Sequence, residues 1–132
     1  MNNLNSIISI VFLFLMSTIT GCQYSQPVQQ QKAISEKEQH QREQLASVVA
    51  ATKYLKYKCN RSDLPDASII IDVASRAAIK NGWHPLVLEK LIKNSDMIYL
   101  RLTRDSTSEK TKCSYFNQVL RPFIDDCQRA IR

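Results

Sequence analysis

The sequence predicts an all-α domain, a small four-helix bundle, and three observations support this expectation. Apolar residues recur at spacings of three and four along most of the chain after residue 35, as they do on the buried face of an amphipathic helix. Residues that favour helix starts and stops separate these stretches. Gly82 is the only glycine after residue 21, so tight glycine-dependent hairpins and glycine-rich phosphate loops are not expected.

The first two helices are expected at about residues 36–59 and 65–81. The apolar face of the first is formed by Leu45, Val48, Thr52, Leu55 and Cys59. Asp63 is a candidate N-cap for the second helix, and Pro65 suits its first turn. The apolar face of this helix is formed by Ile70, Val73, Ala74, Ala77 and Ala78, and Asn81-Gly82 ends it.

The third helix is expected to begin at His84-Pro85 and to end near Arg104. The fourth is expected at about residues 106–131, because Ser106 and Glu109 form a capping-box pattern. Pro122 lacks an N–H and is expected to bend this helix without ending it. The apolar positions of the two helices are Leu88, Leu91, Ile92, Ser95, Ile98, Tyr99 and Leu102, then Cys113, Phe116, Leu120, Phe123 or Ile124, Cys127 and Ile131.

The N-terminus has the pattern of a bacterial lipoprotein signal peptide, expected at residues 1–21. The apolar run from Ile7 to Met16 is too short to span a membrane and fits a signal-peptide core. It leads to Ile19-Thr20-Gly21-Cys22, which resembles a lipobox and implies cleavage before a lipidated Cys22. Gln23 stands where lipoproteins held at the inner membrane usually carry Asp, so this resemblance implies anchoring at the periplasmic face of the outer membrane.

The remaining chain divides into a tether and one domain. Residues 22–35 are polar and rich in Gln, and are expected to form a flexible lipidated tether. Residues 36–132 are expected to form the helical domain. The formal net charge of +6 fits a soluble basic surface, acidic lipid headgroups or an acidic partner. Nucleic acid is not expected as a partner of an exported domain.

An exported domain can form disulfides, and three cysteines follow Cys22. Cys113 and Cys127 are about 21 Å apart along one expected helix, beyond disulfide reach. Cys59 therefore takes part in any bridge, and spacing alone leaves both of the others open as its partner. A Cys127 left unpaired has apolar neighbours one helical turn away, so we expect a buried residue and not a nucleophile.

Catalytic and metal-binding patterns are not recognisable in the sequence. His40 lies in a polar stretch, His84 precedes Pro85, and neither stands at metal-ligand spacing from the cysteines. We expect no enzyme activity and no cofactor besides the covalent lipid on Cys22. A lipoprotein enzyme is thus disfavoured, whereas another periplasmic envelope lipoprotein, acting as a binding or inhibitor module, is the alternative.

Three segments of the domain form a specific pattern: residues 53–65 (KYLKYKCNRSDLP), residues 80–83 (KNGW) and residues 112–117 (KCSYFN), the last followed by Leu120, Pro122, Phe123 and Ile124. In order and spacing they resemble the PulS/OutS-type pilotins of type II secretion systems. The resemblance covers about residues 45–124 and implies a four-helix bundle with a Cys59–Cys113 disulfide. It also implies a pilotin, which binds the disordered C-terminal segment of a secretin as a helix in a groove. Lipoprotein sorting machinery would then carry both proteins to the outer membrane.

The groove is expected on the first and third helices, which carry more apolar positions than one core-facing stripe requires. A wide apolar face that only closes the core is the competing interpretation. The candidate groove residues are Leu45, Val49, Lys53, Lys56, Leu86, Val87, Met97 and Val119. Lys53 and Lys56 are expected at the rim, where they could pair with acidic side chains of the bound helix.

Overall fold

The structure is a computed structural model that describes residues 26–83 and 88–132. The regular structure of these residues is entirely helical, which confirms the predicted all-α class. The helices are α2 (Gln26–Lys58), α3 (Ala67–Lys80), α4 (Leu88–Arg104), α5 (Glu109–Val119) and α6 (Arg121–Arg129). The chain divides into two parts, residues 1–34 and 35–132. The expected signal peptide and the lipidation site at Cys22 lie outside the described residues.

In the first part, residues 26–34 form the beginning of α2. The expected helix start near Glu36 is wrong, because the helix begins at Gln26. Gln, Lys and Ala favour helix, and Pro27 suits the first turn, where its missing N–H would have no intrahelical acceptor. Among the described helices, none has the length and apolar character needed to cross a membrane.

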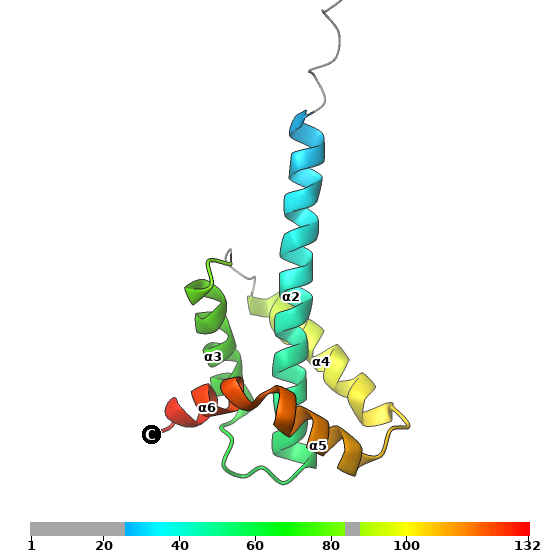
Figure 1. Cartoon of the computed structure of the whole chain (residues 1–132), viewed down its shortest axis with the longest axis vertical. Helices are drawn as coiled ribbons and strands as arrows, with labels where there is room; N and C mark the ends of the chain where they lie inside the picture. Colours follow the sequence, from blue (N-terminus) through cyan, green and yellow to red (C-terminus); the bar gives the residue numbers. More distant parts are fainter. Residues whose placement is uncertain (1–25, 84–87) are drawn as a thin grey trace, which may run out of the picture. The chain divides into compact units, whose positions relative to one another are not determined.

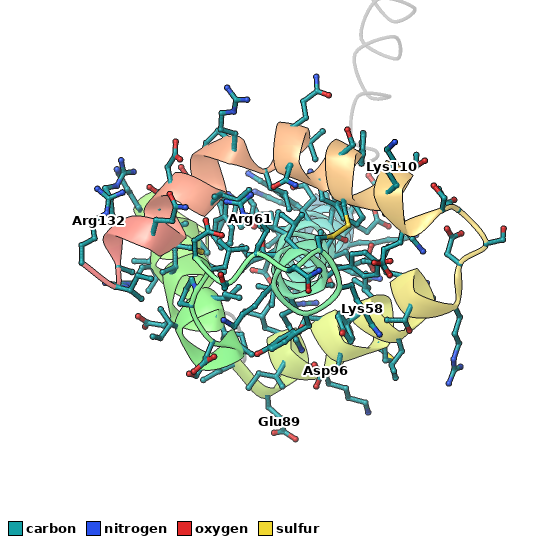
Figure 2. All side chains as sticks on the ribbon, turned by 90° about the horizontal axis from the view of Figure 1, so that it is seen from below. Lys58, Arg61, Glu89, Asp96, Lys110 and Arg132 are labelled. Carbon is teal, nitrogen blue, oxygen red and sulfur yellow. A yellow bond between two sulfur atoms is a disulfide. The ribbon has the colours of Figure 1, made fainter. Side chains whose placement is uncertain are left out.

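In the second part, α2 is the central helix of the bundle. Figures 1 and 2 show α4 on one side of it, α5 and α6 on the opposite side, and α3 beside it. A helix with neighbours on several sides has to be apolar on more than one stripe. The buried residues of α2 accordingly include neighbours in the sequence and not only residues three or four apart. They are Leu45, Ala46, Val49, Ala50, Ala51, Thr52, Tyr54 and Leu55.

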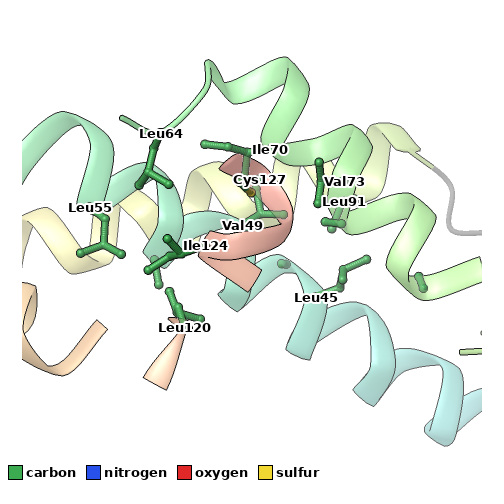
Figure 3. Packing of buried hydrophobic residues seen from close by; sticks show 14 residues of the cluster. Leu45, Val49, Leu55, Leu64, Ile70, Val73, Leu91, Leu120, Ile124 and Cys127 are labelled. Carbon is green, nitrogen blue, oxygen red and sulfur yellow. The ribbon is translucent and has the colours of Figure 1, made fainter. Parts of the chain in front are cut away.

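The other helices complete one core around α2 (Figure 3). They contribute Ile70, Val73, Ala74, Ala78, Leu91, Ile124 and Cys127, together with Leu64 and Leu120 from the connections. Burial of each large aliphatic side chain stabilises the fold by about 1.5–3 kcal/mol. α4 contributes little to this core, because its buried residues are Leu91 and Ser95. Most apolar side chains of α4 therefore lie outside the core.

Residues 81–83 end α3 in a Schellman motif. The N–H of Gly82 donates to the carbonyl of Ile79 at 2.9 Å, and the N–H of Trp83 donates to that of Ala78 at 3.0 Å. Gly82 has φ of 69°, a left-handed conformation that glycine adopts at no steric cost. The motif turns Trp83 back against the core, where it packs partly buried. The predicted stop at Asn81-Gly82 is confirmed.

The fourth expected helix is two helices, α5 and α6, so the prediction that Pro122 only bends it is wrong. Leu120 ends α5 and is also the N-cap residue of α6. Pro122 cannot donate to the carbonyl of Gln118 and would crowd it, so a new helix starts instead. The N-cap of α5 is Ser108, whose hydroxyl accepts from the N–H of Thr111, and not the expected Ser106.

The disulfide links Cys59 at the end of α2 to Cys113 in α5, with 5.7 Å between the Cα atoms. Sulfur atoms joined by a yellow bond mark it in Figure 2. This confirms the pairing that the family resemblance implied and that spacing had left open. Cys127 is a free, buried cysteine, as expected.

Polar side chains tie the connection after α2 to α5 and α6. Arg61 donates to both carboxylate oxygens of Asp63 and, through Nη1, to Oδ1 of Asn117. Gln128 donates to Oδ2 of Asp63 at 2.6 Å. Asp63 therefore does not cap α3 as predicted, and Asp66 occupies the N-cap position.

Candidate functional site

An open hollow of about 660 Å³ lies between α2 and α4. We call it the α2–α4 groove. Its residues on α2 are Glu43 and Ser47, and the others belong to α4 or follow it directly: Asn94, Met97, Ile98, Arg101, Leu102 and Asp105. The α4 residues recur at three and four, so one face of this helix lines the groove.

A second hollow, of about 520 Å³, shares Glu43 and Ser47 with the first. Its other lining residues are His40, Gln44, Leu45 and Val48 of α2, together with Trp83. The two hollows therefore adjoin each other along α2. A depression that follows a helix in this way has the form needed to receive another helix.

The groove has an apolar floor and a charged rim. Met97, Ile98 and Leu102 are apolar, and Met97 remains 47% exposed. Glu43 provides a negative charge on the α2 side, and Arg101 a positive charge on the α4 side. This arrangement favours an amphipathic helix that buries apolar residues and pairs charges at its edges.

Lys53 was predicted at the rim of the groove, but it connects the two helices that form the groove walls. Its Nζ donates to Oδ1 of Asp96 on α4 at 2.5 Å and lies 5.4 Å from the centre of the Tyr99 ring. Lys53 is not among the groove-lining residues, so the prediction of a free rim lysine is wrong.

Lys56 also lies elsewhere than predicted. Its Nζ donates to the carbonyl of Leu64 at 2.7 Å and lies 3.7 Å from Oδ1 of Asp66, so it fixes the connection between α2 and α3. A guest side chain would have to displace this hydrogen bond. Lys56 is therefore a structural residue of the connection and not a groove residue.

The predicted apolar groove residues lie in different parts of the structure. Val49 is fully buried in the core, so the prediction that it flanks the core is wrong. Leu45, expected both on the core face and in the groove, is 6% exposed and lines the second hollow. Met97 lines the groove, whereas Val119 is equally exposed but lies on α5, outside its lining. Leu86 and Val87 lie outside the described residues.

Most residues of the groove were not predicted from the sequence. Ile98 and Leu102 were expected on the core face of the third helix, and Glu43, Ser47, Asn94 and Arg101 were not among the expected site residues. A signal was present, because residues 94, 97, 98, 101, 102 and 105 form a helical stripe beside the one through Leu91 and Ser95. Two adjacent stripes on one helix indicate two packing partners.

Reactive chemistry has few candidates in this part of the chain. Burial raises the pKa of the Cys127 thiol to about 11, which keeps it protonated and unreactive at neutral pH. No group of three His, Cys, Asp or Glu side chains is placed to hold a metal ion within residues 26–83 and 88–132. The groove is thus the feature to which a function can be attached.

The fold and the groove define a small, disulfide-linked helical binding domain. The chain belongs to the type II secretion system pilotin lipoprotein family (PulS_OutS), whose sequence model matches residues 19–125. The match includes the residues around Cys22, the disulfide and the groove.

Two relatives are similar to the chain over most of their length. The pullulanase secretion protein PulS of Klebsiella pneumoniae is 47% identical over 107 residues, which cover 81% of this chain and 84% of PulS. The pilotin OutS of Dickeya dadantii (strain 3937) is 35% identical over an alignment that covers 98% of this chain and 99% of OutS.

Three solved structures share the fold. A crystal structure of the type 2 secretion system pilotin GspS is 57% identical, with a TM-score of 0.64 over 67% of this chain and 97% of that one. A chain of the Klebsiella pneumoniae outer membrane complex of PulD, PulS and the PulC HR domain is 48% identical, with a TM-score of 0.67 over 68% and 97%. A pilotin in complex with a secretin peptide is 41% identical, with a TM-score of 0.66 over 68% and 95%.

Proposed function

We propose that this protein is an outer-membrane pilotin that binds the C-terminal segment of a secretin as an amphipathic helix in the α2–α4 groove. The observation that carries the proposal is the groove, which occurs in a member of a family that includes a pilotin solved with a secretin peptide. The segment would fold on binding and bury its apolar side on Met97, Ile98 and Leu102.

The second part of the proposed function is localisation to the outer membrane. Cys22 carries the lipid and holds the domain at the periplasmic face of the outer membrane, with the bound secretin. Support comes from the lipobox pattern and from the family, whose members are described as lipoproteins. Each lipid methylene buried in the bilayer contributes about 0.8 kcal/mol, so several acyl chains give stable anchoring. Lipoprotein sorting machinery would act on the same modified Cys22.

A matched pair of substitutions tests the position of the groove. Met97 and Val119 are both 47% exposed, but only Met97 lines the groove. We expect Met97→Asp to weaken binding more than tenfold, about 1.4 kcal/mol, because it places a charge on the apolar floor. Val119→Asp should leave the affinity unchanged.

The measurement is fluorescence anisotropy of a labelled peptide from the C-terminal segment of the secretin of the same bacterium. The full-length protein is purified in detergent, and its melting temperature is recorded for both variants. An equal loss of affinity in both variants would move the site to another face. Absence of binding by the unmodified protein would contradict the pilotin function itself.

A further inference from the structure

Lys112 of α5 is a buried lysine, only 8% exposed. Its Nζ donates to the carbonyl of Leu102 at 2.7 Å and to the carbonyl of Asp105 at 3.1 Å. The Asp105 carboxylate lies 3.8 Å from Nζ, and the Tyr54 ring centre lies 5.2 Å from it. Four groups on α2, on α4 and just beyond α4 thus surround one ammonium group.

The carbonyls that Lys112 binds lie at the C-terminal end of α4, which ends at Arg104. The last carbonyls of a helix have no intrahelical donor and carry the negative end of the helix dipole. A lysine from another helix therefore provides the hydrogen bonds and the charge that this helix end lacks. Lys112 acts as a cap supplied from α5.

The capped turn is also a wall of the groove. Leu102 and Asp105 line the α2–α4 groove, and Arg101 lies one residue before Leu102. Lys112 is not among the lining residues and its side chain is only 9% exposed, so it is shielded from a peptide in the groove. Any effect of Lys112 on peptide affinity must therefore act through the position of α4.

The residue after Lys112 connects the same turn of α5 to the other wall. Cys113 is linked by the disulfide to Cys59, directly after the last residue of α2. Two adjacent residues of α5 therefore hold the C-terminal ends of both helices that form the groove. On α2 the groove is lined by Glu43 and Ser47, well before Cys59, so only the attachment through Lys112 acts directly on a segment that lines the groove.

We propose that Lys112 is a positioning residue of the secretin-binding site, which holds the last turn of α4 at the spacing that a bound helix requires. This inference rests on the proposed function, because the affinity it concerns is that for the secretin peptide. A peptide helix that contacts both walls loses contacts when one wall moves. The affinity therefore depends on a side chain that the peptide does not touch.

Lys112→Met tests the inference, because it keeps an apolar stem of similar length and removes the ammonium group. In the full-length protein in detergent, we expect the Kd for the secretin peptide to rise about fivefold or more, as for residues that act through an intermediate element. The Kd is measured at a temperature at which the variant is fully folded. The amide hydrogens of residues 102–105 should exchange faster than in the unmodified protein.

Two controls separate positioning from loss of charge and of stability. Lys110→Met removes the same charge from an exposed position on the outer side of α5 (Figure 2) and should change neither the Kd nor the exchange. Ile70→Val truncates a core residue of α3, outside the groove lining, and should lower the melting temperature without changing the Kd. Lys112→Arg keeps the positive charge on a larger head group. It should raise the Kd and the exchange rate of residues 102–105 as Lys112→Met does, but by less.

The outcomes are distinguishable. A Lys112→Met variant with a lowered melting temperature and an unchanged Kd would overturn the inference, because its role would then be structural only. If Lys112→Met does not fold, an unchanged Kd for Lys112→Arg together with faster exchange at residues 102–105 would overturn it as well. Failure of the proposed function would give a different result, because the unmodified protein and all control variants would then fail to bind the peptide.

Discussion

Arg61 holds Asp63 by two parallel hydrogen bonds, from Nε to Oδ1 at 2.8 Å and from Nη2 to Oδ2 at 2.7 Å. Both bonds favour the charged carboxylate, and together with the hydrogen bond from Gln128 they lower the pKa of Asp63 to about 2. Because Arg61 also donates to Asn117, the pair connects the segment after α2 to α5 and α6. Protonation of one exposed carboxyl group therefore loosens contacts between three segments.

Asp63→Asn should destabilise the protein at neutral pH but hardly at pH 2. The folded-state pKa is depressed, so the stabilisation is present above the unfolded value of about 4 and is lost as the pH falls toward 2. The Asp63 side chain is 46% exposed, so solvent screening reduces the effect to about 1 kcal/mol. Urea unfolding at pH 6.5 and pH 2 measures it, with Asp125→Asn as a control. An equal difference at both pH values would contradict the assignment to this carboxyl.

Val49→Asp should unfold the bundle or cost about 4 kcal/mol or more, because it places a carboxylate in a fully buried position of α2. Val49 belongs to the same core cluster as Ile70, Ile124 and Cys127 (Figure 3). Met97→Asp on the groove floor is the comparison, and should leave the melting temperature within a few degrees. A Val49→Asp protein that melts like the unmodified one would place this side chain on the surface.

Replacing both Cys59 and Cys113 by Ala should lower the free energy of unfolding by about 4 kcal/mol. The bridge spans a sequence separation of 54, and the chain-entropy model assigns a loop of this length that stabilisation. Guanidinium unfolding of the oxidised protein and of the double variant gives the difference. A loss below about 1 kcal/mol would mean that the unfolded chain is already restricted without the bridge.

Cys127 should react slowly with a thiol reagent in the folded protein and rapidly after denaturation. Burial raises its pKa to about 11, so both access and the fraction of thiolate are low at pH 7.5. Time courses with Ellman's reagent, with and without guanidinium, test this. Fast labelling of the folded protein would show that α6 opens readily from α3.

Cys22→Ala should abolish membrane anchoring while the helical domain remains folded, because Cys22 is the residue at which we propose that the acyl chains are attached. The protein should move from the outer-membrane fraction to the soluble periplasmic fraction in cells that lack the secretin. Fractionation and circular dichroism measure the two properties. Unchanged association with outer membranes would refute the lipobox interpretation.

Sequence patterns predicted those parts of the fold that depend on neighbouring residues. The stop at Asn81-Gly82 and the end of α4 at Arg104 follow from local preferences, and both are confirmed. Val49 could not be placed in this way. One apolar stripe per helix is expected where a helix packs on one side only, but α2 is enclosed on several sides and buries adjacent residues.

Lys112 shows a second limit of sequence patterns. A lysine next to a predicted helix start counts as exposed, because buried lysines are rare without partners. Its partners are carbonyls at the end of α4, which are brought to it only by the tertiary fold. Most groove residues were not predicted for the same reason, because the groove forms only where the tertiary fold brings α2 and α4 next to each other.

Leu120 serves two helices at once, as the last position of α5 and the first of α6. Its N–H donates to the carbonyl of Phe116 and its carbonyl accepts from the N–H of Ile124, so no spare residue lies between the helices. An inserted residue at this point would turn all of α6 by about 100°, and would carry Ile124 and Cys127 out of the core. The joint should therefore tolerate no insertion or deletion, and the core position of Leu120 restricts its substitution as well.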